Sequence, residues 1–289
     1  MADAPPTDPV TTGDAPASRA GGDANAAAFF DLDRTLISGS SAFPFGIAAW
    51  RNKLIPTDEL LSDAVNALIF KLVGATDERS EAVRDRILHA VEGAQQDDLL
   101  ALNEEIIPRI LEKVRPESRG LIEMHHEAGR ETWIVSASPI ELVDPLAKAL
   151  GMTGGIATRS EVEDGHYTGR LDGPFVYGEG KREAIQTLAD ERGYDLRLSY
   201  AYSDSASDLP MMEMVGHPVA VNPDRPLETV AHQRGWPMVI FSRRTKQVVK
   251  TTTAAAGAVG LAATTYLLGR RHGRIAGEAE RGRMLRAWR

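Results

Sequence analysis

Apolar and polar positions alternate differently along the chain, and the differences predict where strands and helices lie. We expect the ordered part of the chain to begin at Ala27, in the short apolar run AAAFFDLD. This run ends in acidic residues, which is typical of a buried strand that opens into a loop. From Phe43 to about Arg115 the apolar residues follow helical periodicity only. The expected helices cover 43–53, 58–73, 78–92 and 97–114, and they are separated by Pro56, Gly74, Gly93 and Pro116. We interpret this stretch as a helical insertion.

After Pro116 the expected elements alternate between helix and strand. The helices cover 117–128, 139–150, 181–192 and 207–214, and the strands are ETWIVSAS, LSYAYSD, PVAVN and MVIF, with a hairpin over 155–177 that contains Gly165 and Gly169. This alternation predicts an α/β fold, a doubly wound and mostly parallel sheet with an inserted helical cap domain. Ligands of such sheets bind at the carboxyl ends of the strands.

The same pattern divides the chain into four parts. Residues 1–26 are rich in Ala, Pro, Gly, Thr and Asp, so we expect a disordered leader. A core domain is expected over 27–42 and 116–241, interrupted by the cap over 43–115. Residues 242–289 form a tail in which a hydrophobic stretch has basic flanks. The pattern makes no prediction of the oligomeric state.

Composition adds a few exclusions. The net charge of −8 argues against electrostatically driven nucleic-acid binding, for which a basic domain is expected. The chain has no cysteine, which excludes disulfides and thiolate metal sites. Its first residues carry neither a basic region nor an apolar region of the secretory type. We therefore expect a cytoplasmic location.

Asp31 and Asp33 stand where the first strand is expected to end. Strand geometry with a period of two places both side chains on one side of the sheet. A carboxylate can attack phosphorus, and a second one can protonate the departing alkoxide and then activate water. A phosphate dianion repels two carboxylates, at about 4 kcal/mol per close pair for an effective dielectric near 20. The site therefore needs a hard cation such as Mg²⁺ and a fixed ammonium. The alternative is that the pair only caps a helix or closes a turn.

Three further strand or helix ends carry polar residues. Ser136, followed by Ala137, could hold a phosphate oxygen through its hydroxyl and the loop amides, or cap the helix that starts near Pro139. Lys181 lies where a helix should begin, a position that opposes the helix dipole, and it either balances phosphate charge or is a solvated surface lysine. Asp204 could bind the metal. Asp208 could orient metal-bound water or Lys181, or cap a helix with Ser205 or Ser207.

Taken in order, DLDRT, the serine of WIVSAS, the lysine of GEGK and SDSASD resemble the four motifs of the haloacid dehalogenase superfamily. The resemblance covers roughly 27–241, and the helical stretch resembles the cap of the phosphoserine phosphatase-like subclass. It implies a phosphatase that hydrolyses a phosphate monoester with Mg²⁺ through a phosphorylated aspartate. The resemblance implies that Asp31 is the nucleophile and Asp33 the general acid and base. It implies a phosphate site formed by Thr35, Ser136, Ala137 and Lys181. It also implies a metal site formed by Asp31, Asp204 and the main-chain carbonyl of Asp33, with Asp208 in a supporting role.

The sequence departs from that subclass at the expected substrate site. Phosphoserine phosphatases carry a glutamate nine residues after the nucleophile, where it pairs with the substrate ammonium, and this chain has Ser40 there. It also has SAS and SDSASD where they have SGG and GDGAND. Phe43, Phe45 and Trp50 either line an apolar pocket or pack the cap on the core. We therefore expect another small phosphate monoester. A phosphoserine phosphatase and a non-catalytic, membrane-associated regulatory protein remain alternatives.

Residues 251–269 form an uncharged stretch between basic flanks. As a helix, 19 residues would span about 28 Å, close to the hydrocarbon thickness of a bilayer. Ala, Thr and Gly dominate the stretch, and such residues drive insertion weakly. Three interpretations remain: a membrane anchor, a helix packed on this domain or a second subunit, and a weakly ordered tail. An anchor would make a lipid phosphate an attractive substrate.

Overall fold

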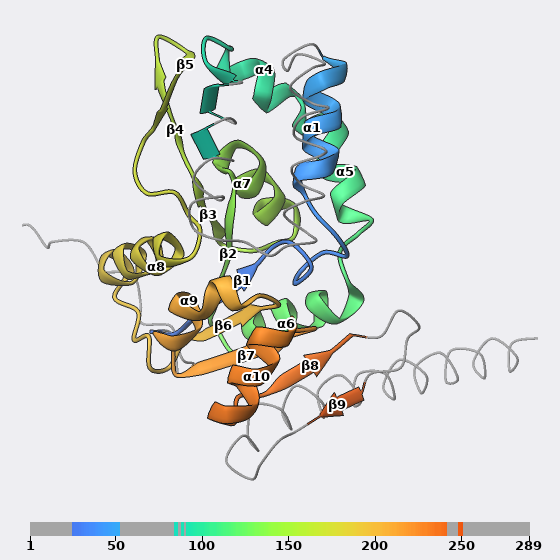
Figure 1. Cartoon of the computed structure of the whole chain (residues 1–289), viewed down its shortest axis with the longest axis vertical. Coiled ribbons are helices and arrows are strands. Elements are labelled where there is room, and N and C mark those ends of the chain that lie inside the picture. The colour runs from blue at the N-terminus through green and yellow to red at the C-terminus, as the bar shows by residue number, and fades with distance from the viewer. Residues whose placement is uncertain (1–24, 53–83, 86–87, 90, 242–247, 251–289) are drawn as a thin grey trace, which may run out of the picture.

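The structure is a computed structural model of the chain, and it describes residues 25–52, 84–85, 88–89, 91–241 and 248–250 (Figure 1). Within these residues one large sheet has the strand order β3-β2-β1-β6-β7-β8-β9. All of its neighbouring strands run parallel except β8 and β9. The prediction of an α/β fold with a mostly parallel sheet is confirmed. The strands of this sheet are β1 (Ala27–Asp31), β2 (Glu131–Pro139), β3 (Gly154–Thr158), β6 (Tyr200–Ser203), β7 (His217–Val221), β8 (Met238–Ile240) and β9 (Val248–Lys250).

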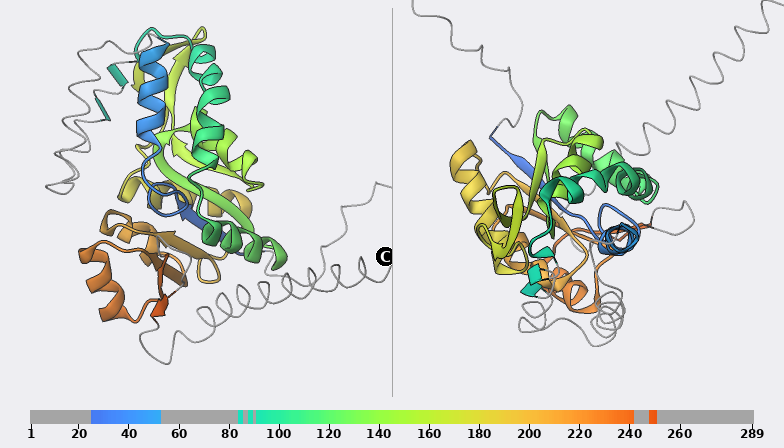
Figure 2. Two further views of the ribbon diagram at one scale, coloured as in Figure 1. Left: turned by 90° about the vertical axis from the view of Figure 1, so that its right-hand side faces the viewer. Right: turned by 90° about the horizontal axis from the view of Figure 1, so that it is seen from above.

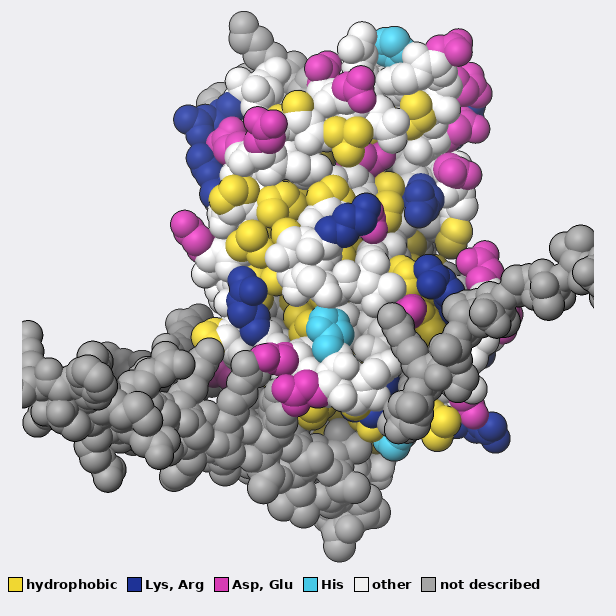
Figure 3. Space-filling view, turned by 180° about the vertical axis from the view of Figure 1, so that it is seen from behind, with side chains coloured by type: hydrophobic (Ala, Val, Ile, Leu, Met, Phe, Trp, Pro, Cys, Tyr) yellow, Lys and Arg dark blue, Asp and Glu magenta, His cyan; other side chains and the backbone are white. Residues whose placement is uncertain are grey.

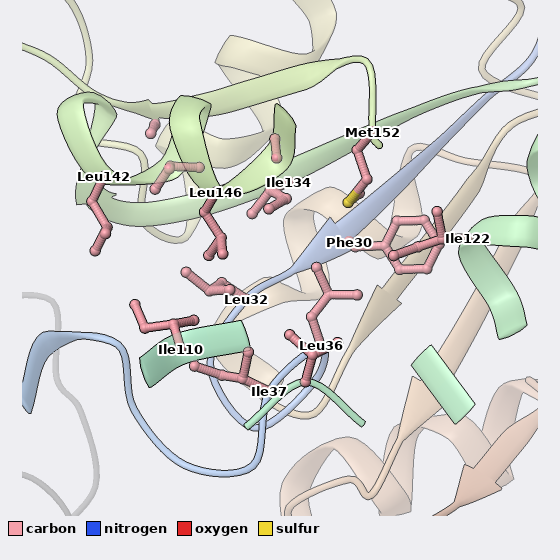
Figure 4. Close-up of a cluster of buried hydrophobic side chains, with 14 of the residues drawn as sticks. Phe30, Leu32, Leu36, Ile37, Ile110, Ile122, Ile134, Leu142, Leu146 and Met152 are labelled. Atoms are coloured by element: carbon pink, nitrogen blue, oxygen red, sulfur yellow. The ribbon is translucent and has the colours of Figure 1, made fainter. Parts of the chain in front are cut away.

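Helices cover both faces of the sheet, because the buried strands carry apolar residues on both sides. In β1, Ala28 and Phe30 belong to one apolar cluster and Ala27 and Phe29 to the other. The first cluster is shown in Figure 4, where Leu146 lies near Ile134 of β2 and near Leu32, which follows β1. The helices are α1 (Ala42–Arg51), α4 (Gln96–Ala101), α5 (Asn103–Leu111), α6 (Pro116–Glu127), α7 (Ile140–Ala149), α8 (Glu179–Arg192), the 3-10 turn η1 (Ala206–Asp208), α9 (Leu209–Glu213) and α10 (Arg225–Arg234).

Two helices of the second half begin and end with recognisable signals. α8 ends at Gly193 and α10 at Gly235, both with left-handed backbones that are favourable for glycine. α10 begins at Asp224, whose side chain accepts a hydrogen bond from the N–H of Leu227. Sequence analysis did not predict α10, although this aspartate and the following Arg-Pro are a helix-start signal.

The region predicted as a cap is described in part. α1 and α5 pack side by side above the sheet (Figure 2, left). The predicted helix over 97–114 occurs as two, α4 and α5, which meet at Leu102. The predicted helix 58–73 and most of 78–92 lie outside the described residues. The two chain connections to this region run together, because Ile37 and Val114 form an antiparallel bridge. The division into core and cap stays a prediction.

Three boundaries differ from those expected. The predicted hairpin over 155–177 is shorter: β3 joins the large sheet, and only β4 (Ser160–Glu163) and β5 (His166–Leu171) form the hairpin, which turns at Asp164 and Gly165. β9 lies within the predicted tail and pairs with β8. Ala26, the last residue of the expected leader, is fully buried. The apolar pattern did not predict these strand assignments, because a short strand is defined by the strand that it pairs with rather than by its own sequence.

The described surface carries mixed charges. On the face seen in Figure 3, basic side chains lie among acidic and hydrophobic ones. The expectation that the chain does not bind nucleic acid stays a prediction. None of the described helices is long and apolar enough to cross a membrane, and residues 251–269 lie outside the described part.

Candidate active site

The expected site residues meet at the point where the sheet reverses its direction of winding. From β1 the chain adds β2 and β3 on one side, and it returns to add β6, β7 and β8 on the other. Asp31 ends β1, Ser136 lies near the end of β2, and Asp204 directly follows β6. Open α/β sheets bind ligands at such a crevice, beyond the carboxyl ends of the strands. Three distant segments therefore deliver their polar groups to one place.

A buried lysine connects two of the aspartates. Lys181 Nζ donates hydrogen bonds to Asp31 Oδ1 at 2.7 Å and to Asp208 Oδ2 at 2.8 Å. The Lys181 side chain is only 4% exposed, so the alternative of a solvated surface lysine is wrong. The odd-numbered positions of β1 face the α8 side of the sheet, which places Asp31 toward the first turn of α8.

Gly180 allows this first turn to approach its neighbour closely. A Cβ atom at Gly180 would lie 1.9 Å from the carbonyl oxygen of Phe175, so no other residue fits without a shift of the backbone. In GEGK only the lysine was predicted to have a role. The glycine before the lysine was a usable signal, because it marks a close backbone approach.

Asp208 supports the lysine and caps no helix. Its Oδ2 accepts hydrogen bonds from Lys181 and, at 2.6 Å, from Ser203 Oγ. α9 begins at Asp208 without any side-chain capping bond, and Ser205 caps the preceding η1 turn. The capping alternative for Asp208 is therefore wrong. Ser203 was missed by sequence analysis, although it is the polar residue that ends an otherwise apolar strand.

The charges of this cluster are unbalanced. Burial raises the pKa of Asp31, with Lys181 opposing the rise and the negative charges of Asp208 and Asp204 adding to it. Burial alone would lower the pKa of Lys181, but Asp208 and Asp31 outweigh burial and keep the ammonium charged. One buried ammonium thus faces three carboxylates. The arrangement needs additional positive charge to keep Asp31 ionised.

Asp33 is held by two donors from the loop that follows it. Ser41 N–H donates to Asp33 Oδ1 at 2.8 Å, and Ser40 Oγ donates to Asp33 Oδ2 at 3.2 Å. Burial raises the pKa of Asp33, and these hydrogen bonds oppose the rise. The balance favours the protonated carboxyl, which is the form that can donate a proton.

The predicted phosphate-binding residues lie in the same region. Ser136 is buried near the end of β2, and its Oγ accepts the N–H of Ser138 at 3.1 Å. It does not cap α7, which begins at Pro139 without a side-chain capping bond. Ala137 follows Ser136 within β2. Thr35 is buried, and its main-chain carbonyl accepts a hydrogen bond from Ser118 Oγ at 3.1 Å.

Asp204 has an incompletely satisfied carboxylate. Thr35 Oγ1 donates to Asp204 Oδ1 at 3.5 Å, while Oδ2 is buried and receives no hydrogen bond from the residues that the structure describes. Arg34 Nη2 lies 2.8 Å from Oδ2 in an ion pair without hydrogen-bond geometry. Burial raises the pKa of Asp204 to about 6; Arg34 opposes this, and Asp208 and Asp224 add to it. Asp224, a residue that sequence analysis missed, also holds this loop through its main chain.

These residues fit a divalent cation of the oxygen-binding type. Within the described ranges no three His, Asp or Glu side chains converge as a metal cluster. The predicted set never required three, because Asp33 was expected to contribute its main-chain carbonyl and its carboxylate is bound by Ser40 and Ser41. The remaining donors are the carboxylates of Asp31 and Asp204. The unbonded Oδ2 of Asp204 and the excess negative charge both suit Mg²⁺.

The arrangement has the parts of one enzyme family, and the sequence matches that family directly. Residues 28–213 match the haloacid dehalogenase-like hydrolases. The chain belongs to this family. The predicted haloacid dehalogenase resemblance is confirmed, and so is the prediction of an enzyme of the phosphoric monoester hydrolase class.

Several relatives of this chain carry phosphatase names. A probable phosphatase of Mycobacterium tuberculosis is 40% identical over 283 residues, which cover 91% of this chain and 98% of the relative. The phosphoserine phosphatase SerB1 of M. tuberculosis is 38% identical over 256 residues, with coverage of 87% and 83%. A histidinol-phosphatase of Neisseria meningitidis is 33% identical over 224 residues, with coverage of 74% and 98%.

Solved structures of other proteins share the fold. A protein of unknown function from Bordetella pertussis has a TM-score of 0.65 and 28% identity, over 74% of this chain and 97% of its own. A phosphoserine phosphatase in a phospho-aspartyl intermediate analogue form has a TM-score of 0.53 and 20% identity, over 71% and 90%. At that identity the second likeness concerns the fold alone.

Proposed function

We propose that this chain is a Mg²⁺-dependent phosphatase in which Asp31 carries the phosphoryl group. The observation that supports this most is the buried contact of Lys181 with Asp31 and Asp208, at the switch point of the sheet. A nucleophilic carboxylate needs such a fixed ammonium beside it, because the ammonium offsets the repulsion between the carboxylate and phosphate.

The reaction has two steps on the chain's own groups. An oxygen of Asp31 attacks phosphorus, the bond between phosphorus and the ester oxygen breaks, and Asp33 gives its proton to the departing alkoxide. A water molecule then attacks the same phosphorus, gives its proton to Asp33, and displaces Asp31 with release of phosphate. Both carboxyl groups return to their initial states.

The phosphoryl group is held by donors that surround it. The Ser136 and Thr35 hydroxyls, the N–H of Ala137 and the Lys181 ammonium are the proposed contacts, and Asp208 orients Lys181. The carboxylates of Asp31 and Asp204 and the main-chain carbonyl of Asp33 would hold Mg²⁺. When bound, it supplies positive charge that neutralises phosphate oxygens.

The substrate is proposed to be a small phosphate monoester. The names of two relatives, a phosphoserine phosphatase and a histidinol-phosphatase, both denote enzymes for small amine-bearing phosphate esters. Phosphoserine itself is the second candidate, favoured by the 38% identity to SerB1. Ser40 argues for a different substrate. Its hydroxyl donates to Asp33, and the side chain has no carboxylate that could pair with a substrate ammonium.

The chemistry is tested by hydrolysis of an aryl phosphate with and without Mg²⁺. We expect turnover that requires the cation and that Asp31→Asn abolishes. Quenching with acid and mass spectrometry should find one phosphate on the peptide that contains Asp31. Turnover by Asp31→Asn would contradict the mechanism, and a protein with no turnover on any monoester would favour a non-catalytic, membrane-associated regulatory role instead.

The substrate is tested by phosphate release from phosphoserine, histidinol phosphate, sugar phosphates, glycerol phosphate and lysophosphatidate. The Ser40→Glu variant is compared on the same panel. We expect it to raise turnover of phosphoserine relative to that of glycerol phosphate, and an unchanged ratio would count against the role given to this position.

A membrane-bound substrate is considered for one reason, the uncharged segment 251–269. If this segment anchors the chain, lysophosphatidate becomes the favoured monoester. Fractionation of cells that contain the full chain, compared with a chain ending at Arg244, decides the point. Equal recovery of both in the soluble fraction would end the proposal of an anchor.

A further inference from the structure

Arg34 occupies an unusual place beside the proposed metal site. It directly follows Asp33, its backbone is left-handed with φ of 64°, and its N–H donates to the carbonyl of Gly39 at 2.9 Å. Such a backbone is strained for a non-glycine residue and persists where surrounding contacts hold it. The start of the side chain is thus fixed, while the long remainder can move.

The guanidinium of Arg34 is paired with the carboxylate oxygen that a metal cation would need as a ligand. Arg34 Nη2 lies 2.8 Å from Asp204 Oδ2, and that oxygen receives no hydrogen bond from any described residue. No other cationic side chain among the described residues forms an ion pair with Asp204. A guanidinium has only donors and carries a permanent charge, so it cannot be a metal ligand, and it repels a divalent ion nearby.

Arg34 differs from Lys181 in how easily it can leave. The Arg34 side chain is 57% exposed, whereas that of Lys181 is 4% exposed and bonded to two carboxylates. Moving Lys181 would strand buried charges at a large cost. Moving Arg34 returns its exposed guanidinium to water, and a cation that binds Asp204 at the same time compensates the charge of the buried carboxylate.

We propose that Arg34 is a displaceable counter-ion of the metal site, which pairs with Asp204 in the absence of a divalent cation and turns away when one binds. This inference rests on the proposed function, because it takes Asp204 as a metal ligand. It explains why an exposed arginine stands next to the acid-base residue. It also means that the cation competes with a side chain of the protein for the same oxygen.

The test is the affinity of the full chain for Mg²⁺ alone, measured by titration calorimetry and by the rise in melting temperature with Mg²⁺. We expect Arg34→Gln to bind Mg²⁺ roughly three- to tenfold more tightly than the wild type, because the cation no longer competes with a guanidinium for Asp204 Oδ2. Its melting temperature without Mg²⁺ should fall, and its gain on adding Mg²⁺ should be larger.

Arg182→Gln is the matched control, because Arg182 lies next to Lys181, is 55% exposed and pairs with the exposed Glu179. It removes the same charge without touching Asp204, so its Mg²⁺ affinity should equal that of the wild type at 0.15 M salt, where exposed charges are screened beyond about 8 Å. Equal affinity in the wild type and Arg34→Gln, or equal tightening in both arginine variants, would overturn the inference.

Asp204→Asn separates this inference from the proposed function. If Asp204→Asn loses Mg²⁺ binding while Arg34→Gln equals the wild type, the metal site stands and the role of Arg34 fails. If Asp204→Asn binds Mg²⁺ as the wild type does, or the wild type binds none, the proposed metal site fails and Arg34 has no role to play in it.

Discussion

The hydroxyl groups of Ser41 and Ser138 lie 3.0 Å apart and join the loop after β1 to the end of β2, although the two residues are 97 positions apart in the chain. Each of the two serines also contacts a residue of the proposed active site. The N–H of Ser41 donates to Asp33 Oδ1, and the N–H of Ser138 donates to Ser136 Oγ. The hydrogen bond thus connects the proposed acid and base with the proposed phosphate-binding serine, and Ser138 occupies the place of a glycine in the family pattern.

This connection predicts non-additive kinetics for its two members. Ser41→Ala and Ser138→Ala should each lower kcat for an aryl phosphate about 2- to 10-fold with little change in KM, since each variant lacks one hydrogen bond of about 0.5–1.5 kcal/mol. The double variant should be no slower than the slower single one. Effects that multiply in the double variant would show that the two serines act separately.

Asp224 should control the loop that carries Asp204. Its carboxylate accepts the N–H of Ala206 at 3.2 Å and Ser205 Oγ at 3.3 Å, and the same side chain caps α10. Asp224→Ser keeps a helix cap and the main-chain hydrogen bond to Asp204, but it loses the carboxylate contacts to Ser205 and Ala206. We expect it to raise the Mg²⁺ concentration for half-maximal activity several-fold while stability changes by less than about 1 kcal/mol.

The comparison for this prediction is Asp224→Ala, which loses both the α10 cap and the side-chain contacts to the loop. It should show the same Mg²⁺ dependence as Asp224→Ser and an additional stability loss of about 1 kcal/mol. A normal Mg²⁺ requirement in Asp224→Ser would mean that the loop holds Asp204 without this residue.

Gly180→Ala should destabilise the fold, although alanine usually favours a helix. The added Cβ would meet the carbonyl oxygen of Phe175, which is backbone and cannot turn aside. We expect the free energy of unfolding in urea to fall by about 1–3 kcal/mol, and the affinity for phosphate to fall because Lys181 is displaced. Glu179→Ala, at an exposed position in the same turn, should change neither quantity, and a stabilised Gly180→Ala would contradict the close approach.

His125 should make the protein sensitive to mild acid. It is fully buried, accepts a hydrogen bond from Arg130 Nε on Nδ1 at 2.8 Å, and contacts Tyr202 Oη through Nε2 at 2.8 Å. Burial, with Arg130 adding to it, lowers the pKa of His125 to about 3, against about 6.5 in an unfolded chain. The unfolded state therefore binds a proton first, and stability is lost as pH falls from 6.5 toward 3.

Unfolding in urea at several pH values tests this. His125→Gln does not titrate but can still accept from Arg130 and donate to Tyr202. Its free energy of unfolding should depend less on pH between 6.5 and 4, with a slope reduced by up to about 1.4 kcal/mol per pH unit. His89→Gln, at a position that is 77% exposed, should keep the wild-type slope, and a shared slope in all three proteins would contradict the prediction.

Much of the fold could be predicted because its elements have local signatures. The apolar run of β1 and the α8 pattern ending at Gly193 each appear in a few consecutive residues. The candidate site followed from one more step, that parallel strands bring their carboxyl ends together. That step placed Asp31, Ser136 and Asp204 in one region without any coordinates.

Other features depended on partners that a local pattern cannot show. β9 exists as a strand through its pairing with β8, and β3 belongs to the large sheet through its pairing with β2. The burial of Lys181 was equally hidden, because a lysine in a helical turn looks the same whether it faces water or two carboxylates.

The amino-acid sequence by itself determined the order of the elements, the parallel sheet and the residue types at the strand ends, because backbone periodicity and turn chemistry are short-range. Only the tertiary structure decided which groups meet: that Ser40 and Ser41 hold Asp33, and that Arg34 pairs with Asp204. Such contacts depend on side-chain direction and on the approach of segments far apart in the chain. Burial then determines how far the pKa values of the charged groups shift.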